Sequence, residues 1–311
     1  MDLFSVTLPL AYALDLALGD PRWLPHPVKG LGKLIQRAEA VLRAQVHSEV
    51  VGGWFLVIGI TVGTLGFVQG SLLVVRALSP WCAWGLEVFL LYACLSTRDL
   101  AVESWPVFRA LQAGDLKQAR AQVAMIVGRD TDSLTEPEIV RATVETIGES
   151  AMDGIIAPLF YAAIGGAPLA CLYKAVNTMD SMVGYRSARY LKFGQAAAWL
   201  DSWMNVIPAS LTAFLIAAAA QGTGFSGRES LRVLFRDAWH RRENSWIPEA
   251  ALAGALGVRL GGTNFYQGKP AVAPSLGDPH RPLTADRIPQ AIRIMYACSF
   301  LGIVAAVVAR L

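Results

Sequence analysis

Charged residues are scarce in this sequence. Asp, Glu, Lys and Arg make up only 16% of its 311 residues, whereas hydrophobic residues make up 54%. Because about a quarter of the residues of a soluble globular protein are charged, this chain lacks the polar surface that such a protein exposes to water. The formal net charge is only +3, and no basic stripe interleaved with aromatic residues indicates a nucleic-acid partner. The composition therefore predicts an integral membrane protein that does not bind nucleic acid.

Cysteine is rare as well. The four cysteines, Cys82, Cys94, Cys171 and Cys298, lie far apart in apolar stretches and form no Cys-x-x-Cys pair. This spacing argues against a zinc motif or a redox motif, and we expect buried, reduced thiols. The N-terminus lacks the basic segment and the small-residue cleavage site of a signal peptide. We therefore expect the first apolar run, residues 3–18, to remain as a membrane segment.

Long apolar runs are what the sequence does contain. They cover residues 3–18, 51–75, 81–95, 154–173, 203–220 and 294–309. A spanning helix needs about 20 mainly apolar residues, and only 51–75 meets this comfortably. The run 154–173 is interrupted by Gly165-Gly166 and Pro168, which predicts a broken or re-entrant segment. No stretch has a strand-and-turn pattern long enough to build a sheet.

These patterns predict an all-α, multi-pass helical membrane protein with about four to six membrane segments, some of them re-entrant. We expect a single integral membrane domain, residues 1–311, with amphipathic helices packed at one membrane face. The polar regions are 19–50, 96–153, 174–202 and 221–293, and Lys and Arg are most frequent in the first, second and fourth. The positive-inside rule places those three in the cytoplasm. If 154–173 does not cross the membrane, every later loop changes side.

An acidic cluster begins at Arg129-Asp-Thr-Asp132. Asp130 and Asp132 are two residues apart, a common arrangement of oxygen ligands for Mg²⁺, and Arg129 beside them suits a phosphate. On the helix predicted to follow, one stripe carries Glu138, Glu145, Glu149 and Asp153. The alternative is a solvated surface loop and helix, with Thr135 and Glu138 forming a capping box. Because the stripe runs directly into an apolar segment, we expect a cation or a basic partner beside it.

Two further clusters and one turn carry polar side chains that suit ligand binding. The segment 174–186 contains Lys174, Asn177, Asp180, Ser181, Tyr185 and Arg186, which suit substrate or phosphate contacts or, alternatively, helix capping beside a membrane. Residues 240–269 contain Asn244, Glu249 and Asn264, together with a Gly261-Gly262 pair that suits an anion-binding nest. His26 lies in a proline-rich turn, where it acts as a proton carrier, a substrate contact or a structural residue.

Taken in order, these motifs resemble the adenosylcobinamide-phosphate synthase family of cobalamin biosynthesis (CobD/CbiB type). The resemblance covers nearly the whole chain, and its motifs are long and uncommon. They are Gly19-Asp-Pro21, Leu24-Pro-His-Pro-Val28, Arg129-Asp-Thr-Asp-Ser-Leu134, Glu138-Ile-Val-Arg-Ala-Thr-Val-Glu145, Asp153-Gly-Ile-Ile-Ala-Pro-Leu-Phe-Tyr161, Lys174-Ala-Val-Asn-Thr-Met-Asp-Ser-Met-Val-Gly-Tyr-Arg186, Pro248-Glu249, Gly254-Ala-Leu-Gly-Val-Arg-Leu-Gly-Gly262 and Asn264.

The resemblance implies a multi-pass enzyme of the cell (inner) membrane with its active site on the cytoplasmic side. Such an enzyme uses ATP and Mg²⁺ to join aminopropanol, or its O-phosphate, to a propionate of adenosylcobyric acid through an amide bond. A carboxylate is a poor acyl donor, so an acyl phosphate is the expected intermediate. The expected partners are the corrinoid, the amine and the lipid bilayer, with other membrane-bound cobalamin-pathway enzymes and a second copy of the chain as further candidates.

The resemblance also implies roles for individual residues. It assigns metal binding to Asp130, Asp132 and Glu149, and catalytic acid or base roles to Glu145, Glu149, Asp153 and Asp180. The expected substrate or phosphate contacts are His26, Arg129, Arg141, Lys174, Asn177, Ser181, Tyr185, Arg186, Asn244, Glu249 and Asn264.

The sequence departs from the family pattern at two places. Gly148-Glu149-Ser150 replaces the usual Ala-Glu-Asn, and Arg241 and Arg242 stand in a loop that usually contains two prolines. These changes leave open a regulatory or sensory relative that has lost turnover. A transporter is a further alternative, because Asp15 and Glu87 lie within apolar runs, although no inverted repeat is evident.

Overall fold

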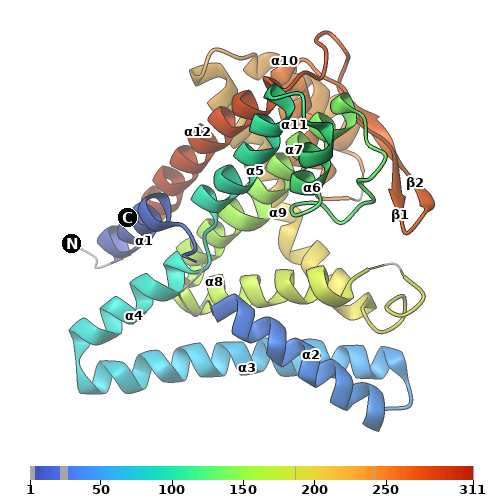
Figure 1. Ribbon diagram of the computed structural model, residues 1–311. Helices are drawn as coiled ribbons and strands as arrows, with labels where there is room; N and C mark the ends of the chain where they lie inside the picture. The colour runs from blue at the N-terminus through green and yellow to red at the C-terminus, as the bar shows by residue number, and fades with distance from the viewer. Residues whose placement is uncertain (1–3, 22–26, 186, 242, 311) are drawn as a thin grey trace. The chain divides into compact units, whose positions relative to one another are not determined.

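The computed structural model describes residues 4–21, 27–185, 187–241 and 243–310. Its elements, drawn in Figure 1, are α1 (Phe4–Leu18), α2 (Pro27–Gln45), α3 (Glu49–Leu78), α4 (Pro80–Tyr92), α5 (Thr97–Gln112), α6 (Leu116–Val123), α7 (Glu136–Ala151), the π-helical turn η1 (Met152–Ile156), α8 (Ala157–Val183), α9 (Gln195–Gly222), α10 (Gly227–Val233), the π-helical turn η2 (Leu234–Ala238), α11 (Trp246–Leu256), β1 (Leu260–Tyr266), β2 (Lys269–Leu276) and α12 (Arg287–Val308). The predicted all-α class is confirmed.

Four helical stretches in the described part of the chain are long and apolar enough to cross a membrane. They are Glu49–Leu78, Glu136–Val183, Gln195–Gly222 and Arg287–Val308. Residues 6–18 form a shorter apolar helix, and α4 has only 13 residues. The predicted multi-pass character is thus confirmed, with four candidate spans.

The contacts divide the chain into two compact units. The first comprises Met1–Ser96, Ala157–Val206 and Ile303–Leu311, and the second comprises Thr97–Ile156 and Ile207–Gly302. The single membrane domain predicted for residues 1–311 stays a prediction.

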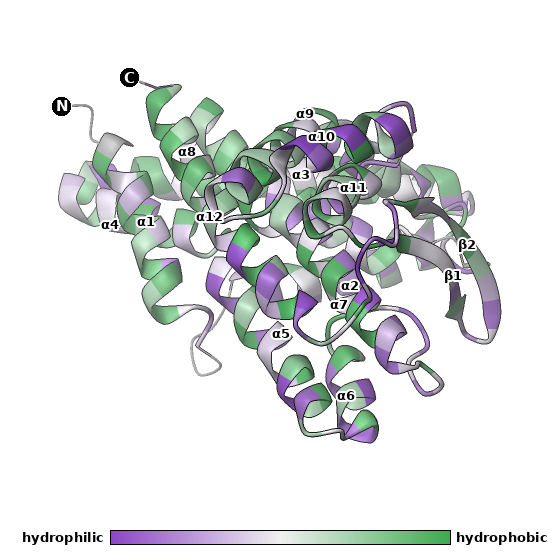
Figure 2. Ribbon diagram, turned by 90° about the horizontal axis from the view of Figure 1, so that it is seen from above, coloured by the Kyte–Doolittle hydropathy of each residue, from purple (hydrophilic) through white to green (hydrophobic). Residues whose placement is uncertain are grey.

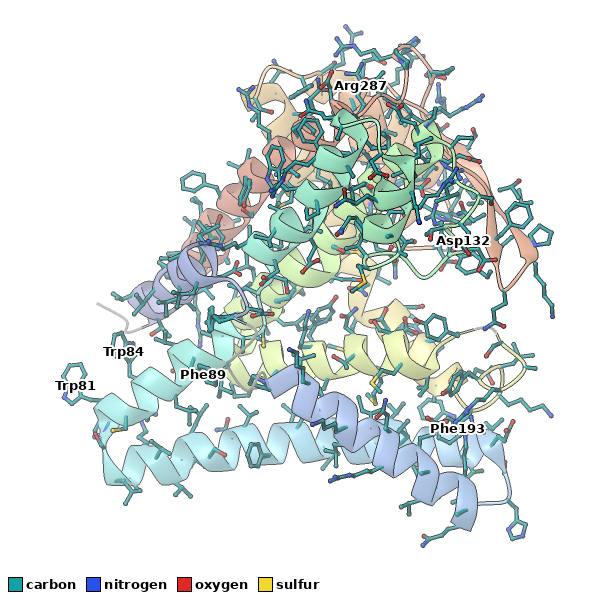
Figure 3. All side chains as sticks on the ribbon, viewed as in Figure 1. Trp81, Trp84, Phe89, Asp132, Phe193 and Arg287 are labelled. Atoms are coloured by element: carbon teal, nitrogen blue, oxygen red, sulfur yellow. The ribbon has the colours of Figure 1, made fainter. Side chains whose placement is uncertain are left out.

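The first unit is built around α2, α3 and α8. All three helices pack against one another, and Figure 1 shows α2 crossing α3. Ile35, Leu56 and Met179 are among the buried residues of their shared core. Arg43 at the end of α2 holds the segment before α9 in place: it donates to the Arg189 carbonyl at 2.8 Å and lies 4.3 Å from the centroid of the Phe193 ring, which is labelled in Figure 3.

The glycine pair Gly165-Gly166 breaks the helical geometry of α8, as predicted. Gly165 has φ −144° and ψ 23°, and Gly166 has φ 65° and ψ −155°. The positive φ of Gly166 is readily adopted only by glycine, and Pro168 two residues later cannot donate a helical hydrogen bond.

The second unit packs α7 against α5, α6, α11 and the hairpin of β1 and β2. Its helices α5 and α6 alternate between hydrophilic and hydrophobic residues in Figure 2, which matches amphipathic helices with one buried face. The capping box predicted at the start of α7 is present: the Glu138 carboxylate accepts hydrogen bonds from the Thr135 backbone N–H at 2.8 Å and from its hydroxyl at 2.6 Å.

The prediction that no sheet forms is wrong for one hairpin. β1 pairs with β2 in antiparallel register from Gly262↔Ala273 to Tyr266↔Lys269. The two turn residues, Gln267 and Gly268, both have positive φ, as a tight hairpin turn of type I′ requires. Prolines and glycines interrupt the alternating pattern of both strands, so the sequence does not predict them. A two-stranded ribbon tolerates such residues, since a strand edge leaves some N–H groups unpaired.

Candidate functional site

The candidate site lies in the second unit, where α7 and α11 meet the first residues of β1. Five buried or half-buried polar residues gather here from segments that are far apart in the sequence: Arg129, Arg141, Glu145, Glu249 and Asn264. All five were predicted as site residues. The helical spacing of Arg141 and Glu145 places both on one side of α7, and the hairpin brings Asn264 to them.

Glu145 is the central acid of this cluster. It is only 4% exposed, its Oε1 accepts a hydrogen bond from the Gly261 backbone N–H at 2.8 Å, and its Oε2 lies 2.7 Å from Nη1 of Arg129. A buried carboxylate requires this kind of compensation, because removal from water is costly for a charged group. Glu145 therefore holds Arg129 and the start of β1 together.

Arg141 fixes the backbone of the hairpin. Its guanidinium donates to the Gly261 carbonyl, to the Thr263 carbonyl at 3.2 Å and to Oδ1 of Asn264 at 2.9 Å. Arg129 donates to the same Asn264 oxygen, also at 2.9 Å. Two guanidinium groups thus converge on one amide oxygen, which determines the orientation of the Asn264 side chain and makes this end of the cluster cationic.

Glu249 supplies a second buried acid, on α11. It is 8% exposed, and α11 packs so closely on α7 that a Cβ at Gly148 would lie 3.4 Å from the Glu249 Cα. Burial raises the pKa of the Glu249 carboxyl well above its ordinary value. The neighbouring carboxylates Glu145 and Glu149 raise this pKa further, while Arg129 opposes them. A carboxyl in this environment retains its proton at a higher pH than an ordinary glutamate does, so it suits proton transfer.

Asp130 has a different environment from the one predicted for it. Both of its carboxylate oxygens accept hydrogen bonds from the hairpin turn, from the Gln267 N–H at 3.0 Å and from the Gly268 N–H at 2.8 Å. Its own N–H donates to the Phe265 carbonyl at 2.8 Å. Asp130 therefore ties the loop before α7 to the hairpin turn.

The predicted magnesium ligands do not assemble into a metal centre. Within the described ranges no three His, Cys, Asp or Glu side chains are grouped so that they would hold a metal ion. Asp132, labelled in Figure 3, and Glu149 are exposed, and the oxygens of Asp130 are engaged by the hairpin turn. The set Asp130, Asp132 and Glu149 does not fit a metal held by three protein ligands.

The remaining predicted residues are distributed over both units. Asp153 lies in η1 and Asn244 in the loop before α11, both in the second unit. Lys174, Asn177, Asp180, Ser181 and Tyr185 belong to the first unit. There the Ser181 hydroxyl donates to the Asn177 carbonyl at 2.9 Å, a bond within α8, while Tyr185 is 56% exposed. His26 and Arg186 lie outside the described residues.

Two backbone features of the site were not among the predicted contacts. The Gly261 N–H and carbonyl contact Glu145 and Arg141, and Gly261 has φ 76°. A Cβ at this position would collide with the Pro274 carbonyl, so glycine is required. The double glycine in the sequence was the available signal, although its partners on α7 lie more than 100 positions earlier in the chain and could not be identified from spacing.

A cavity of about 530 Å³ also lies within the second unit, at the C-terminal end of α11. Its walls include Glu229, Asp278, His280 and Arg281. The acids are partly neutralised, since Arg232 pairs with Glu229 at 3.0 Å and Arg236 pairs with Asp278 at 2.8 Å. This arrangement is polar and of mixed charge.

Fold and site together define an all-α membrane protein with a buried cluster of acids and arginines. The sequence profile described as "CobD/Cbib protein" matches residues 8–295, and the chain belongs to the CobD/CbiB family. It is 50% identical to "Cobalamin biosynthesis protein CobD" of Geobacter metallireducens over 303 residues, which cover 96% of this chain and 94% of that protein.

Other members of the family are similar over nearly their whole length. "Cobalamin biosynthesis protein CobD" of Klebsiella pneumoniae is 43% identical over 301 residues, covering 94% of this chain and 93% of that protein. "Cobalamin biosynthesis protein CbiB" of Salmonella arizonae is 41% identical over 308 residues, covering 97% of this chain and 96% of that protein. No solved structure matches the chain significantly.

Proposed function

We propose that this protein catalyses an ATP-dependent amide-bond formation in cobalamin biosynthesis. Aminopropanol, or its O-phosphate, is joined to a propionate of adenosylcobyric acid, giving adenosylcobinamide or its phosphate. Membership of the CobD/CbiB family supports the pathway. The observation that carries the chemical assignment is the buried group of Arg129, Glu145 and Glu249, which combines a cationic site with a carboxyl whose raised pKa makes its ionised form a good proton acceptor.

The reaction proceeds in two steps. A propionate oxygen attacks the γ-phosphorus of ATP, so a C–O–P linkage forms while ADP leaves. The amine nitrogen then attacks the acyl carbon, loses one proton and expels inorganic phosphate. The second step needs a proton acceptor, and both steps need cationic groups near developing negative charge.

Arg129 supplies the cationic contact. Its side chain is 12% exposed, so it combines an open edge with a position fixed by Glu145 and Asn264. Arg141 acts as a positioning residue, because its donors are directed to the Gly261 and Thr263 carbonyls and to Asn264. It holds Asn264 where Arg129 also contacts it.

Glu249 accepts the proton that the attacking amine releases. Its raised pKa makes it a stronger base than an ordinary glutamate, and a proton acceptor works best when its pKa lies near the operating pH. The close packing of α11 against Gly148 of α7 fixes its position.

Magnesium enters this proposal with ATP, as the counter-ion that neutralises charge on the phosphates. No step is assigned to a protein-held metal, because Asp130 binds the hairpin turn.

We further propose that the protein acts in the cell (inner) membrane with its site open to the cytoplasm, where ATP is available. Other cobalamin-pathway enzymes and a second copy of the chain are candidate partners.

The test uses the purified chain in detergent with adenosylcobyric acid, ATP and Mg²⁺, with aminopropanol and aminopropanol phosphate in separate reactions. We expect the amide product by mass spectrometry from the wild type.

Glu145→Gln should abolish formation of the amide product and lower the free energy of unfolding by about 3 kcal/mol, because the buried Arg129 loses its partner. Glu136→Gln, which removes an exposed acid in the first turn of α7, is the matched control and should retain activity. Corrinoid binding without product in the wild type would favour the regulatory relative.

A further inference from the structure

An apolar cavity of about 260 Å³ lies within the first unit, whereas the residues of the proposed reaction belong to the second unit. Its walls come from α2, α3, the end of α4 and α8, and they include Leu31, Leu34, Phe67, Leu90 and Cys171. Among the described residues that line it, Lys174 on α8 carries the one charged side chain.

Within the part of the chain that the structure describes, no acidic side chain pairs with Lys174. No ion pair or hydrogen bond of its ammonium group occurs among the residues that the structure describes, and its side chain is half-buried. It also lies within a candidate membrane span, Glu136–Val183. A cation in apolar surroundings is costly unless it is paired, and intramembrane charges usually mark a ligand or a partner. An anion in the cavity would supply the missing charge partner.

The other walls of the cavity are apolar and suit a hydrocarbon chain. Phe67 on α3 is 75% exposed and Leu34 on α2 is 54% exposed, and both line the cavity. Gly63 on the candidate span α3 also lines it, and a Cβ there would meet nothing within 4 Å. A water-soluble anion would leave these walls without a partner, whereas a neutral chain would leave Lys174 without one.

We infer that this cavity binds an anionic phospholipid, whose phosphate pairs with Lys174 while an acyl chain covers Gly63 and Phe67. The helix α2 favours this occupant, since Lys29, Lys33 and Arg37 form an exposed basic stripe on it. Basic helices at membrane surfaces and basic pockets between membrane helices attract anionic lipid headgroups. The phosphate or carboxylate contact predicted for Lys174 is thereby assigned to a lipid, independently of the proposed reaction.

Native mass spectrometry of the delipidated full-length chain tests this inference without ATP or corrinoid. Phosphatidylglycerol and phosphatidylcholine with identical acyl chains are added separately. We expect one saturable phosphatidylglycerol molecule, bound about tenfold more tightly than phosphatidylcholine, as a gain of one favourable charge pair allows. Inorganic phosphate at millimolar concentration should not displace it.

Two pairs of variants locate the site. Lys174→Gln should reduce phosphatidylglycerol binding to the level of phosphatidylcholine, Lys174→Arg should preserve it, and Lys192→Gln, which removes an exposed lysine of the same unit, should have no effect. Gly63→Leu should abolish binding of both lipids. Gly70→Leu should not, because Gly70 also faces open space on α3 but does not line the cavity.

Three results would overturn the inference. Equal affinity of the wild type for the two lipids would remove the role of charge, and unchanged binding in Lys174→Gln and Gly63→Leu would place the lipid elsewhere. Displacement by inorganic phosphate would show that the cavity holds a water-soluble anion instead.

Discussion

Single residues of the candidate site differ in how tightly their neighbours constrain them. Glu145 has a partner on each carboxylate oxygen, and Asn264 accepts from two arginines. Glu249 is buried among like charges, which raises its pKa. The chemistry we propose therefore depends most on Glu249, whose charge the environment disfavours.

The pH dependence of the rate tests the role of Glu249. Its folded-state pKa lies above the ordinary glutamate value, so the base form accumulates at a higher pH than for a free carboxyl, and the rate should rise through that pKa. Glu249→Gln should reduce the rate about 100-fold or more and abolish this rise. An unchanged profile in the variant would exclude Glu249 as the proton acceptor.

The free energy of unfolding should fall as the pH rises over the same range in which the rate increases. Because the folded-state pKa is raised, the contribution of Glu249 is fully present below the unfolded-state pKa and is lost as pH rises through the folded-state pKa. In Glu249→Gln this loss should disappear, which thermal unfolding in detergent between pH 4 and pH 8 would detect.

Gly148 offers a second test at the residue scale, because α7 and α11 pack closely at this position. A Cβ there would meet Glu249 and Leu252 atoms at 3.4–3.6 Å, an ordinary van der Waals separation. Gly148→Ala should therefore preserve activity and raise stability by up to about 1 kcal/mol, since alanine favours helix. Gly261→Ala is the contrasting variant and should lose activity, because its Cβ would collide with the Pro274 carbonyl. A large loss in Gly148→Ala would contradict the packing described for α7 and α11.

At the scale of elements, the hairpin of β1 and β2 organises the site. It presents Gly261 and Asn264 to α7, and Asp130 secures its turn at the other end. Nearby, Asp237 of η2 accepts from the Gly277 N–H at 2.8 Å just beyond β2. The guanidinium of Arg236 lowers the pKa of Asp237, so this contact should persist until the pH falls below the ordinary aspartate range.

Asp130→Asn separates a structural role from metal binding. An amide oxygen replaces only one of the two carboxylate acceptors, so the N–H groups of Gln267 and Gly268 should exchange hydrogen for deuterium at least several-fold faster. The Mg²⁺ concentration that gives half-maximal activity should remain that of the wild type. A marked increase in this concentration, with unchanged exchange, would restore Asp130 as a metal ligand.

At the scale of the whole molecule, the sequence was informative about class and less so about long-range contacts. Low charge and long apolar runs predicted a multi-pass all-α protein, and Gly165-Gly166 marked the break in α8. The hairpin was missed because Pro270 and Pro274 interrupt the pattern of β2. Helical spacing related Arg141 to Glu145, but only the fold brings Glu249 and Asn264 to them. The division into two units depends on contacts between distant segments, which periodicity does not reveal.

In the reaction that we propose, the protein activates a corrinoid carboxylate with ATP and transfers the acyl group to an amine. Adenosylcobyric acid labelled with ¹⁸O in its propionate carboxylate tests this most directly, in a reaction with ATP, Mg²⁺ and the amine. We predict that each turnover yields one amide product and transfers one ¹⁸O atom to the inorganic phosphate released. Amide formed without ¹⁸O in the phosphate would contradict the acyl-phosphate route, and no amide with either amine would contradict the proposed function itself.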